Sequence, residues 1–342
     1  MSKEYSTLLD GLLNGQSLTE AQAYNLMHKL ADGELPAALA GALLAGLRAK
    51  GETAEEIRGF ATAMRELAVQ PNIPDGAPTV DTVGTGGDGS GSLNLSTGTG
   101  LLAAACGSRV VKHGNRSVSS RSGSADMLEC LGMPLPLHEQ QAVACLEATG
   151  FTFLFAPAYH PAMKAVVPIR GALSVRTVFN VLGPLTNPAA PPYQLIGAYS
   201  QEAAKLMADT LSGMPLERAF VVHGEPGWDE ATPAGDFVLY DVTPGKVTEN
   251  RRSPEDYGLV RCQPEDLKGG DAEHNAKELE RVFTGEDKGA HRDALLMGTS
   301  LVLEVQGQAS DAQDGVSQAA AAIDDGRAQA FLGALREHFS RL

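Results

Sequence analysis

The sequence predicts an α/β protein in which a small N-terminal helical domain precedes a larger domain built on a central, mostly parallel β-sheet. Helical signals without strand patterns occupy residues 4–70, whereas short apolar runs alternate with helical runs after Thr79. A glycine-dense turn follows the first apolar run, as in sheets that bind ligands at their strand ends. We expect one domain over 1–72 and a second over 78–342, joined by a linker with three prolines.

Residues 4–70 predict four helices. Thr19 with Gln22 and Thr53 with Glu56 form two capping boxes, and Pro36 is placed to begin a helix between them. The apolar faces of these short helices could form an internal core or contact a partner subunit, and the pattern alone leaves both open.

From Thr79 onwards, β-like and helix-like runs alternate, which predicts a parallel or mixed sheet with helices on its faces. Two runs near the middle of the chain suggest an added hairpin or edge pieces, and helices dominate from Ala272 to the end. The expected strands are 79–83, 109–111, 151–155 and 219–223, the expected helices are 101–106, 124–130, 140–148 and 201–212, and the hairpin runs are 236–240 and 245–249.

Composition restricts the class of partner. A formal net charge of −15 argues against a general nucleic-acid surface, so an anionic substrate must be held by a local cluster of amides and cations. The four cysteines lack C-x-x-C spacing and suggest reduced thiols. No apolar run approaches the roughly 20 residues that span a bilayer, and the N-terminus lacks a signal-peptide core. We therefore expect a cytoplasmic protein without a membrane partner.

The glycine-dense turn is the first candidate site. Five of the eight residues from Gly84 to Gly91 are glycine, which permits positive φ and lets backbone amides converge on an anion. Ser96 or Thr97 can begin a helix whose N-terminus favours negative charge. A second polar turn at 112–116 follows another β-like run, and we expect Lys112 at a strand end, burying little surface. The simplest ligand is a phosphate or pyrophosphate.

Three motifs in this order and spacing resemble the anthranilate phosphoribosyltransferase family: Gly-Thr-Gly-Gly-Asp at 84–88, Asn-Leu-Ser-Thr at 94–97 and Lys-His-Gly-Asn-Arg at 112–116. The resemblance extends from about Leu8 to the C-terminal helices and includes the motifs at 176–188 and 227–230. It implies transfer of a phosphoribosyl group from phosphoribosyl pyrophosphate to anthranilate in tryptophan biosynthesis, on the fold shared with nucleoside phosphorylases. It also implies a homodimer through the helical domain, which helices from about 160–190 would join.

The implied reaction displaces pyrophosphate from the ribose by an aromatic amine that is already neutral at pH 7. Positioning and stabilisation of the leaving group are then the main tasks, and we assign no residue as acid or base. Asp88 could steady the loop or orient an amine or a ribose hydroxyl. The residues expected to bind phosphoribosyl pyrophosphate are Gly84, Gly86, Gly87, Asp88, Asn94, Ser96, Thr97 and Lys112.

The resemblance also implies a Mg²⁺ site and an acceptor site. The adjacent carboxylates Asp229 and Glu230, on an exposed turn, and the Ser96 hydroxyl suit Mg²⁺, a hard cation that prefers a few carboxylates plus substrate phosphates. The Arg170 fork suits the anthranilate carboxylate. The residues expected around anthranilate are Gly84, Asn115, Tyr159, His160, Arg170 and Gly183.

Three other interpretations are weighed against this one. A nucleoside phosphorylase would not be expected to carry the motif at 112–116, and a nucleic-acid-binding relative would carry a basic surface. A transferase for another aromatic amine or acid is excluded least well, because acceptor choice depends on pocket shape. The sequence departs from the family at 295–300, where an Asn-Ala pair is more usual, and this puts local packing in doubt.

Overall fold

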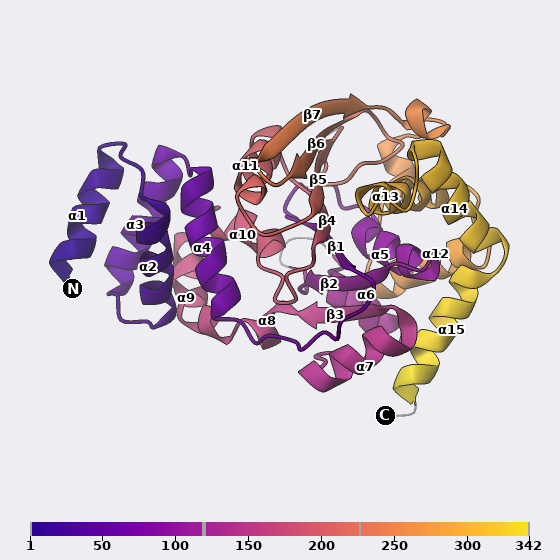
Figure 1. Cartoon of the computed structure of the whole chain (residues 1–342), viewed down its shortest axis with the longest axis horizontal. Helices are drawn as coiled ribbons and strands as arrows, with labels where there is room; N and C mark the ends of the chain where they lie inside the picture. The colour runs from indigo at the N-terminus through magenta and orange to yellow at the C-terminus, as the bar shows by residue number, and fades with distance from the viewer. Residues whose placement is uncertain (1, 118–120, 226, 341–342) are drawn as a thin grey trace.

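The computed structural model describes residues 2–117, 121–225 and 227–340. The four predicted N-terminal helices are confirmed and lie together at one end of the molecule (Figure 1). Both predicted capping boxes are present, at Thr19 and at Thr53. The four helices are α1 (Ser2–Leu13), α2 (Glu20–Ala31), α3 (Ala37–Lys50) and α4 (Ala54–Glu66).

A seven-stranded sheet in the order β3-β2-β1-β4-β5-β6-β7 forms the centre of the second part. The pairs from β3 to β5 are parallel, whereas β6 and β7 form the predicted hairpin and add antiparallel pairs at one edge. The sequence patterns did not predict β4. The strands are β1 (Thr79–Gly84), β2 (Arg109–Gly114), β3 (Phe151–Phe155), β4 (Tyr193–Gly197), β5 (Arg218–Gly224), β6 (Phe237–Thr243) and β7 (Lys246–Arg252).

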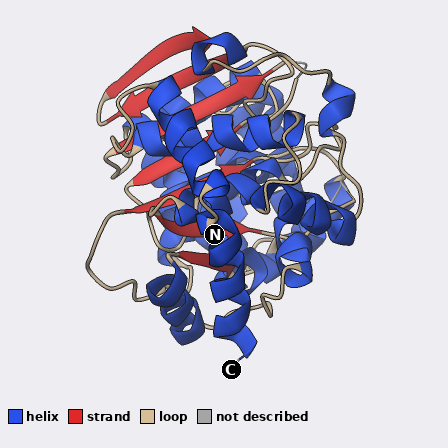
Figure 2. Cartoon of the chain, turned by 90° about the vertical axis from the view of Figure 1, so that its right-hand side faces the viewer, coloured by secondary structure: helices blue, strands red, loops and turns tan. Residues whose placement is uncertain are grey.

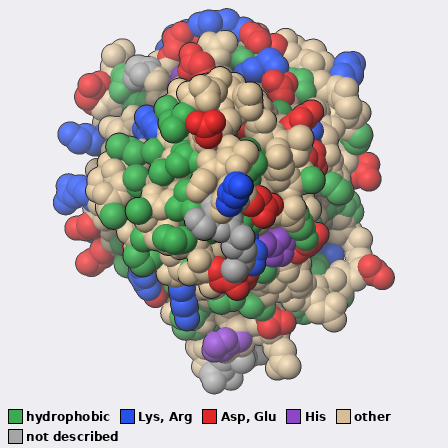
Figure 3. All heavy atoms as spheres, turned by 90° about the vertical axis from the view of Figure 1, so that its left-hand side faces the viewer, with side chains coloured by type: hydrophobic (Ala, Val, Ile, Leu, Met, Phe, Trp, Pro, Cys, Tyr) green, Lys and Arg blue, Asp and Glu red, His purple; other side chains and the backbone are tan. Residues whose placement is uncertain are grey.

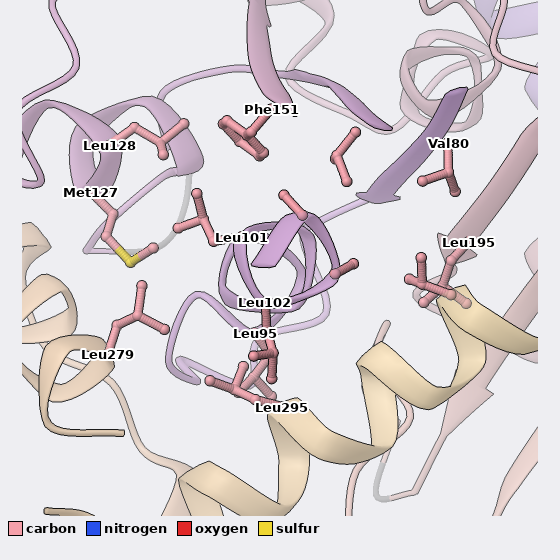
Figure 4. Close-up of a cluster of buried hydrophobic side chains, with 14 of the residues drawn as sticks. Val80, Leu95, Leu101, Leu102, Met127, Leu128, Phe151, Leu195, Leu279 and Leu295 are labelled. Atoms are coloured by element: carbon pink, nitrogen blue, oxygen red, sulfur yellow. The ribbon is translucent and has the colours of Figure 1, made fainter. Parts of the chain in front are cut away.

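The sheet separates two hydrophobic cores, with helices on both faces (Figure 2). Successive strand residues alternate between the cores, so that Leu195 faces one and Ile196 faces the other. Figure 4 shows the first core around α5, with Leu101 and Leu102 directed from this helix toward different neighbours. The helices of this core are α5 (Leu95–Ala105), α6 (Ser124–Cys130), α7 (Glu139–Thr149), α12 (Ala272–Phe283), α13 (Ala290–Val305), α14 (Ala312–Asp324) and α15 (Arg327–Ser340).

The second core runs without interruption from the N-terminal helices to the other face of the sheet. Phe60 of α4 packs against Phe179 with their ring centroids 6.4 Å apart. Short helices from the middle of the chain fill the space between the N-terminal helices and the sheet. They are α9 (Val167–Leu173) and α10 (Phe179–Leu185), and α11 (Gln201–Ser212) covers the sheet beyond them. The short α8 (Ala156–Tyr159) follows β3, and its Tyr159 belongs to the first core. The division at 72–78 stays a prediction.

The unusual segment 295–300 lies inside α13 and is buried along its whole length. A Cβ on Gly298 would lie 2.3 Å from the Thr99 hydroxyl, so glycine at this position lets α13 approach α5 closely. Because α5 begins at the glycine-dense loop, this contact supports the loop from behind. Among the described residues, no helix combines the length and apolarity needed to span a membrane.

Candidate active site

The candidate site lies where the chain changes direction across the sheet. β1 pairs with β2 on one side and with β4 on the other, and all three strands run parallel. Ligands of open α/β sheets bind beside the carboxyl ends of strands at such a point. The strands meeting there end at glycines: Gly84, Gly114, Gly197 and Gly224.

The loop after β1, residues 84–91, holds a conformation that depends on glycine. Gly86 and Gly87 have φ of 66° and 71°, in the left-handed region that side chains disfavour. Asp88 closes the loop, because its Oδ1 accepts hydrogen bonds from the Ser90 amide at 3.1 Å and the Ser90 hydroxyl at 2.9 Å. Asp88 therefore steadies the loop, one of the two roles predicted for it.

A second segment, the acid turn (residues 227–231), folds back onto this loop. Asp229 Oδ2 accepts from the Gly86 amide at 2.6 Å, and the Asp229 amide donates to Asp88 at 3.2 Å. Glu230 Oε1 accepts from the Ser96 amide at 3.0 Å, in the first turn of α5. Residues predicted to bind phosphoribosyl pyrophosphate and the predicted metal pair are thus joined by direct hydrogen bonds.

Glycines at the strand ends make this approach possible. A Cβ on Gly197 would lie 1.5 Å from the Asp229 carbonyl oxygen, and one on Gly84 would lie 2.5 Å from Asp229 Oδ2. A Cβ on Gly224 would lie 2.1 Å from the Glu230 carbonyl oxygen. No real side chain tolerates such distances, so the acid turn can pack here only against bare backbone.

Asp229 is buried and Glu230 is only partly exposed, so the expectation of an exposed turn was wrong. Asp229 is only 8% exposed. Burial, reinforced by the charge of Asp88, raises the pKa of Asp229, and burial with the charge of Asp229 raises the pKa of Glu230. Crowded carboxylates of this kind favour a nearby cation.

The donor set fits Mg²⁺ but does not complete its coordination shell. Asp229 and Glu230 are adjacent in the chain, and the Ser96 amide donates to Glu230. These neighbouring residues carry carboxylate and hydroxyl oxygens, which are ligands that a hard cation prefers. The described part of the chain contains no group of three or more acidic, histidine or cysteine side chains arranged to hold a metal by itself. Oxygens from a bound phosphate would have to supply the remaining positions.

Lys112 is not the exposed strand-end cation that the sequence suggested. It lies inside β2 and is 1% exposed. Its Nζ donates to the Thr82 carbonyl and lies 3.4 Å from the Ser96 hydroxyl. Lys112 does not stand at the strand end, because β2 continues to Gly114. Its side chain therefore points inward beneath the loop. Burial lowers the pKa of Lys112, whereas the charges of Asp81, Glu230 and Asp229 oppose that shift.

Lys112 faces a buried aspartate that the sequence analysis missed. Asp81 of β1 accepts from the His113 amide at 3.2 Å and from Asn187 Nδ2 at 2.8 Å. Asn187 also donates to the Val111 carbonyl at 2.8 Å. Burial raises the pKa of Asp81 to about 6, although Lys112 opposes the shift. An ionisable residue in the middle of a predicted buried strand was the signal that could have indicated this network.

Two histidines lie beside this network, and one of them, His160, was predicted to contact the acceptor. The rings of His113 and His160 are 5.1 Å apart between centroids. Burial lowers the pKa of His113 to about 3 and that of His160 to about 4. Both are therefore neutral at pH 7 and can act there as hydrogen-bonding groups rather than as charges.

The other residues predicted for the acceptor occupy different surroundings. Arg170 of α9 stacks on Phe179, with its guanidinium carbon 5.2 Å from the ring centroid. A Cβ on Gly183 would meet nothing within 4 Å, so there is open space beside this backbone. Asn115 is exposed. Tyr159 is 2% exposed, and its hydroxyl donates to the Leu137 carbonyl, so this tyrosine is part of the core.

Two residues predicted to bind phosphoribosyl pyrophosphate, Asn94 and Thr97, make contacts within the fold instead. Asn94 donates to the Ser122 carbonyl at 3.1 Å and accepts from Asn275 at 2.8 Å, tying the end of the loop to α12. Thr97 is buried within α5. The direct contact set at the strand ends therefore comprises Gly86, Asp88, Ser96, Lys112, Asp229 and Glu230, with Gly84 packed against Asp229.

Comparisons with known proteins agree with this fold. Residues 76–329 match the model of the glycosyl transferase family a/b domain, and residues 6–68 match that of the family's helical bundle domain. The chain therefore belongs to this glycosyl transferase family. Within it, the similar proteins are anthranilate phosphoribosyltransferases. The one from Rubrobacter xylanophilus is 43% identical over 318 residues, which are 93% of this chain and 92% of that protein.

Solved structures give the same result. The anthranilate phosphoribosyltransferase of Thermus thermophilus is 40% identical with a TM-score of 0.91, over 97% of this chain and 99% of that one. The enzyme of Saccharomyces cerevisiae in complex with phosphoribosyl pyrophosphate and Mg is 25% identical with a TM-score of 0.90, over 100% and 99% of the two chains.

The buried histidines predict how stability depends on pH. A histidine whose pKa falls from about 6.5 unfolded to about 4 folded binds its proton more readily in the unfolded chain, so stability is lost as pH falls between these values. We expect His160→Gln to flatten the slope of the unfolding free energy against pH in this window, by up to roughly 1.4 kcal/mol per pH unit. Urea unfolding at several pH values measures the slope.

The matched control is His138→Gln, which changes an exposed histidine at the start of α7. Its slope should equal that of the wild type. A His160→Gln slope identical to the wild type would contradict a buried neutral imidazole.

Proposed function

We propose that this protein transfers the 5-phosphoribosyl group from phosphoribosyl pyrophosphate to the amine of anthranilate, releasing pyrophosphate, as a step of tryptophan biosynthesis. The observation that supports it best is the acid turn hydrogen-bonded to the glycine loop at the strand ends, with Lys112 buried beneath both. The similar proteins carry this activity in their names. They do not favour a transferase for a different acceptor or a nucleic-acid-binding role.

The glycine loop and the first turn of α5 are the proposed site for phosphoribosyl pyrophosphate. Backbone amides of a positive-φ loop and of a helix N-terminus attract phosphate oxygens. The Gly86 and Ser96 amides already donate to Asp229 and Glu230, so other amides of the loop would have to bind the phosphate. The residues proposed to bind this substrate are Gly84, Gly86, Gly87, Asp88, Asn94, Ser96, Thr97 and Lys112. Thr97 and Lys112 are buried beneath the loop. They would touch the substrate only if the loop moved, and otherwise influence it from below. Lys112 supplies a positive potential there at short range.

Mg²⁺ is proposed to enter with the substrate and to be held by Asp229, Glu230 and Ser96. The yeast enzyme was solved in complex with phosphoribosyl pyrophosphate and Mg. When bound, the ion neutralises charge that develops on the departing pyrophosphate. The chain's own part is to hold oxygen ligands in place, because hydrogen bonds from Gly86 and Ser96 fix the orientation of both carboxylates.

Anthranilate is proposed to lie on the side of Gly183, with Arg170 binding its carboxylate. The acceptor set remains Gly84, Asn115, Tyr159, His160, Arg170 and Gly183, and a complex of the yeast enzyme with 4-fluoroanthranilate supports such a site. Stacking on Phe179 fixes the plane of the Arg170 fork. Neutral His113 and His160 add hydrogen-bonding groups without a competing charge. Tyr159 would contribute by holding the segment before His160.

The reaction then needs no dedicated acid or base in this chain. The anthranilate nitrogen forms a bond to C1 of the ribose, and the bond from C1 to the pyrophosphate oxygen breaks. The nitrogen loses its proton to water or to the pyrophosphate as the product forms. Positioning of the two substrates and stabilisation of the leaving group supply the rate enhancement.

The oligomer is proposed to be a homodimer through the helical domain. Figure 3 shows hydrophobic side chains gathered on the face at the N-terminal end of the molecule. Leu13 of α1 is 69% exposed, and Leu8 and Leu9 of the same helix are only partly buried. Multi-angle light scattering should give twice the 35.8 kDa chain mass, and a monomer at micromolar concentration would contradict the dimer.

We also propose a cytoplasmic location without a nucleic-acid partner.

One assay tests the proposed activity. Purified protein with Mg²⁺ and phosphoribosyl pyrophosphate should consume anthranilate, whose own fluorescence then falls. Omission of either Mg²⁺ or the sugar pyrophosphate should abolish the change. Full consumption of benzoates or anilines, with anthranilate left untouched, would contradict the proposed acceptor.

The variant Arg170→Lys tests acceptor recognition in the same assay. Lysine keeps the charge but loses the bidentate fork and the stack on Phe179, so we expect the KM for anthranilate to rise about tenfold or more. The KM for phosphoribosyl pyrophosphate should change little. Equal weakening of both substrates would show that Arg170 holds the fold or a shared element instead.

A further inference from the structure

Arg176 connects the helical domain to the glycine loop, although neither the motifs nor the site residues above assign it a role. Its Nη2 donates to the Gly87 carbonyl, and its guanidinium carbon lies 3.9 Å from the centroid of the Tyr199 ring. Its own carbonyl accepts from Nη1 of Arg48 at 2.6 Å, and Arg48 belongs to α3. One side chain and one peptide thus link α3, the turn after β4 and the loop.

The platform beneath Arg176 is itself attached to the loop. The Tyr199 amide donates to the Thr85 hydroxyl at 3.0 Å, and the Thr85 amide donates to the Gly197 carbonyl at 3.0 Å. The beginning of the loop is therefore held through the end of β4. Arg176, stacked on the Tyr199 ring, holds the loop two residues further along.

The contact with Gly87 fixes the orientation of a whole peptide group. A trans peptide is planar, and its C=O and N–H point in opposite directions. A hydrogen bond that fixes the Gly87 carbonyl therefore fixes the direction of the Asp88 amide on the other side of the same peptide. Gly87 has φ of 71° and no side chain to restrict it, so without an external contact this peptide would rotate easily.

We infer that Arg176 is a positioning residue, which orients the Gly87–Asp88 peptide and so prepares the loop to bind pyrophosphate, with Arg48 linking this arrangement to the helical domain. The expected effect on substrate binding rests on the proposed function, since a preorganised loop loses less conformational freedom when phosphoribosyl pyrophosphate binds. Its structural part does not depend on any substrate.

The chemistry separates this role from direct binding of substrate by the Arg176 charge. Stacking on Tyr199 and donation to a carbonyl need the planar guanidinium. Arg176→Lys keeps the charge and should behave like Arg176→Gln if Arg176 positions the loop. Tyr199→Leu removes the platform without changing any charge, and should reproduce part of the effect.

Hydrogen–deuterium exchange on the free protein is the first measurement. Peptides covering 84–91 should exchange faster in Arg176→Gln, Arg176→Lys and Tyr199→Leu, and to a smaller extent in Arg48→Gln. The control Arg281→Gln changes an exposed arginine of α12, paired with Glu278, and should exchange like the wild type. Unchanged exchange over 84–91 in both Arg176 variants would overturn the inference, whether or not the protein has the proposed activity.

Kinetics is the second measurement. Arg176→Gln and Arg176→Lys should each raise the KM for phosphoribosyl pyrophosphate by about tenfold, the effect of one lost hydrogen bond to a charged donor, with the KM for anthranilate within twofold of the wild type. Wild-type values in Arg176→Lys alone would show a simple phosphate-binding charge and would overturn the positioning role. Accelerated exchange in the Arg176 variants, together with a wild type that lacks transferase activity, would leave the loop contact standing and contradict the proposed function.

Discussion

The closeness of the acid turn to the strand ends is the constraint on which the site depends. The Asp229 carbonyl lies against Gly197 so tightly that a single added carbon would stand 1.5 Å from it. This packing brings the Asp229 carboxylate onto the Gly86 amide and the Glu230 carboxylate onto the Ser96 amide. Glycine at the ends of three strands is therefore needed for shape rather than for flexibility.

Electrostatic balance is the second requirement. Three carboxylates, those of Asp81, Asp229 and Glu230, act on Lys112, whose ammonium is buried between β1 and the first turn of α5. Removal of one partner of a buried charge group is strongly unfavourable, because the others lose their compensation. Lys112 therefore contributes to folding as well as to the field at the loop, and substitutions there change both properties.

The sequence predicted the helical domain, most of the sheet and the identity of the loop, because capping boxes, alternating runs and dense glycine are local signals. It did not predict β4, since Tyr193–Gly197 is short and its two buried faces give no alternation of polar and apolar residues. Burial of Lys112 and Tyr159 also escaped prediction. Their surroundings are created by segments such as 81–82 and 137, which are distant in the sequence. The contacts of Arg176 escaped for the same reason.

Trp228 offers the most direct test of the central claim, that the acid turn and the glycine loop together bind the magnesium complex of phosphoribosyl pyrophosphate. It is the only tryptophan, is buried, and directly precedes the acid pair. Its fluorescence should change when Mg²⁺ and phosphoribosyl pyrophosphate are added together, and much less with either alone. Asp229→Asn with Glu230→Gln keeps acceptors for Gly86 and Ser96 but supplies poor ligands for a hard cation, so the magnesium-dependent part should vanish. Of the carboxylates around Lys112 only Asp81 then compensates its charge, so the protein should be less stable, and circular dichroism checks that it is still folded. A full magnesium-dependent signal in the double variant, with activity retained, would contradict the account.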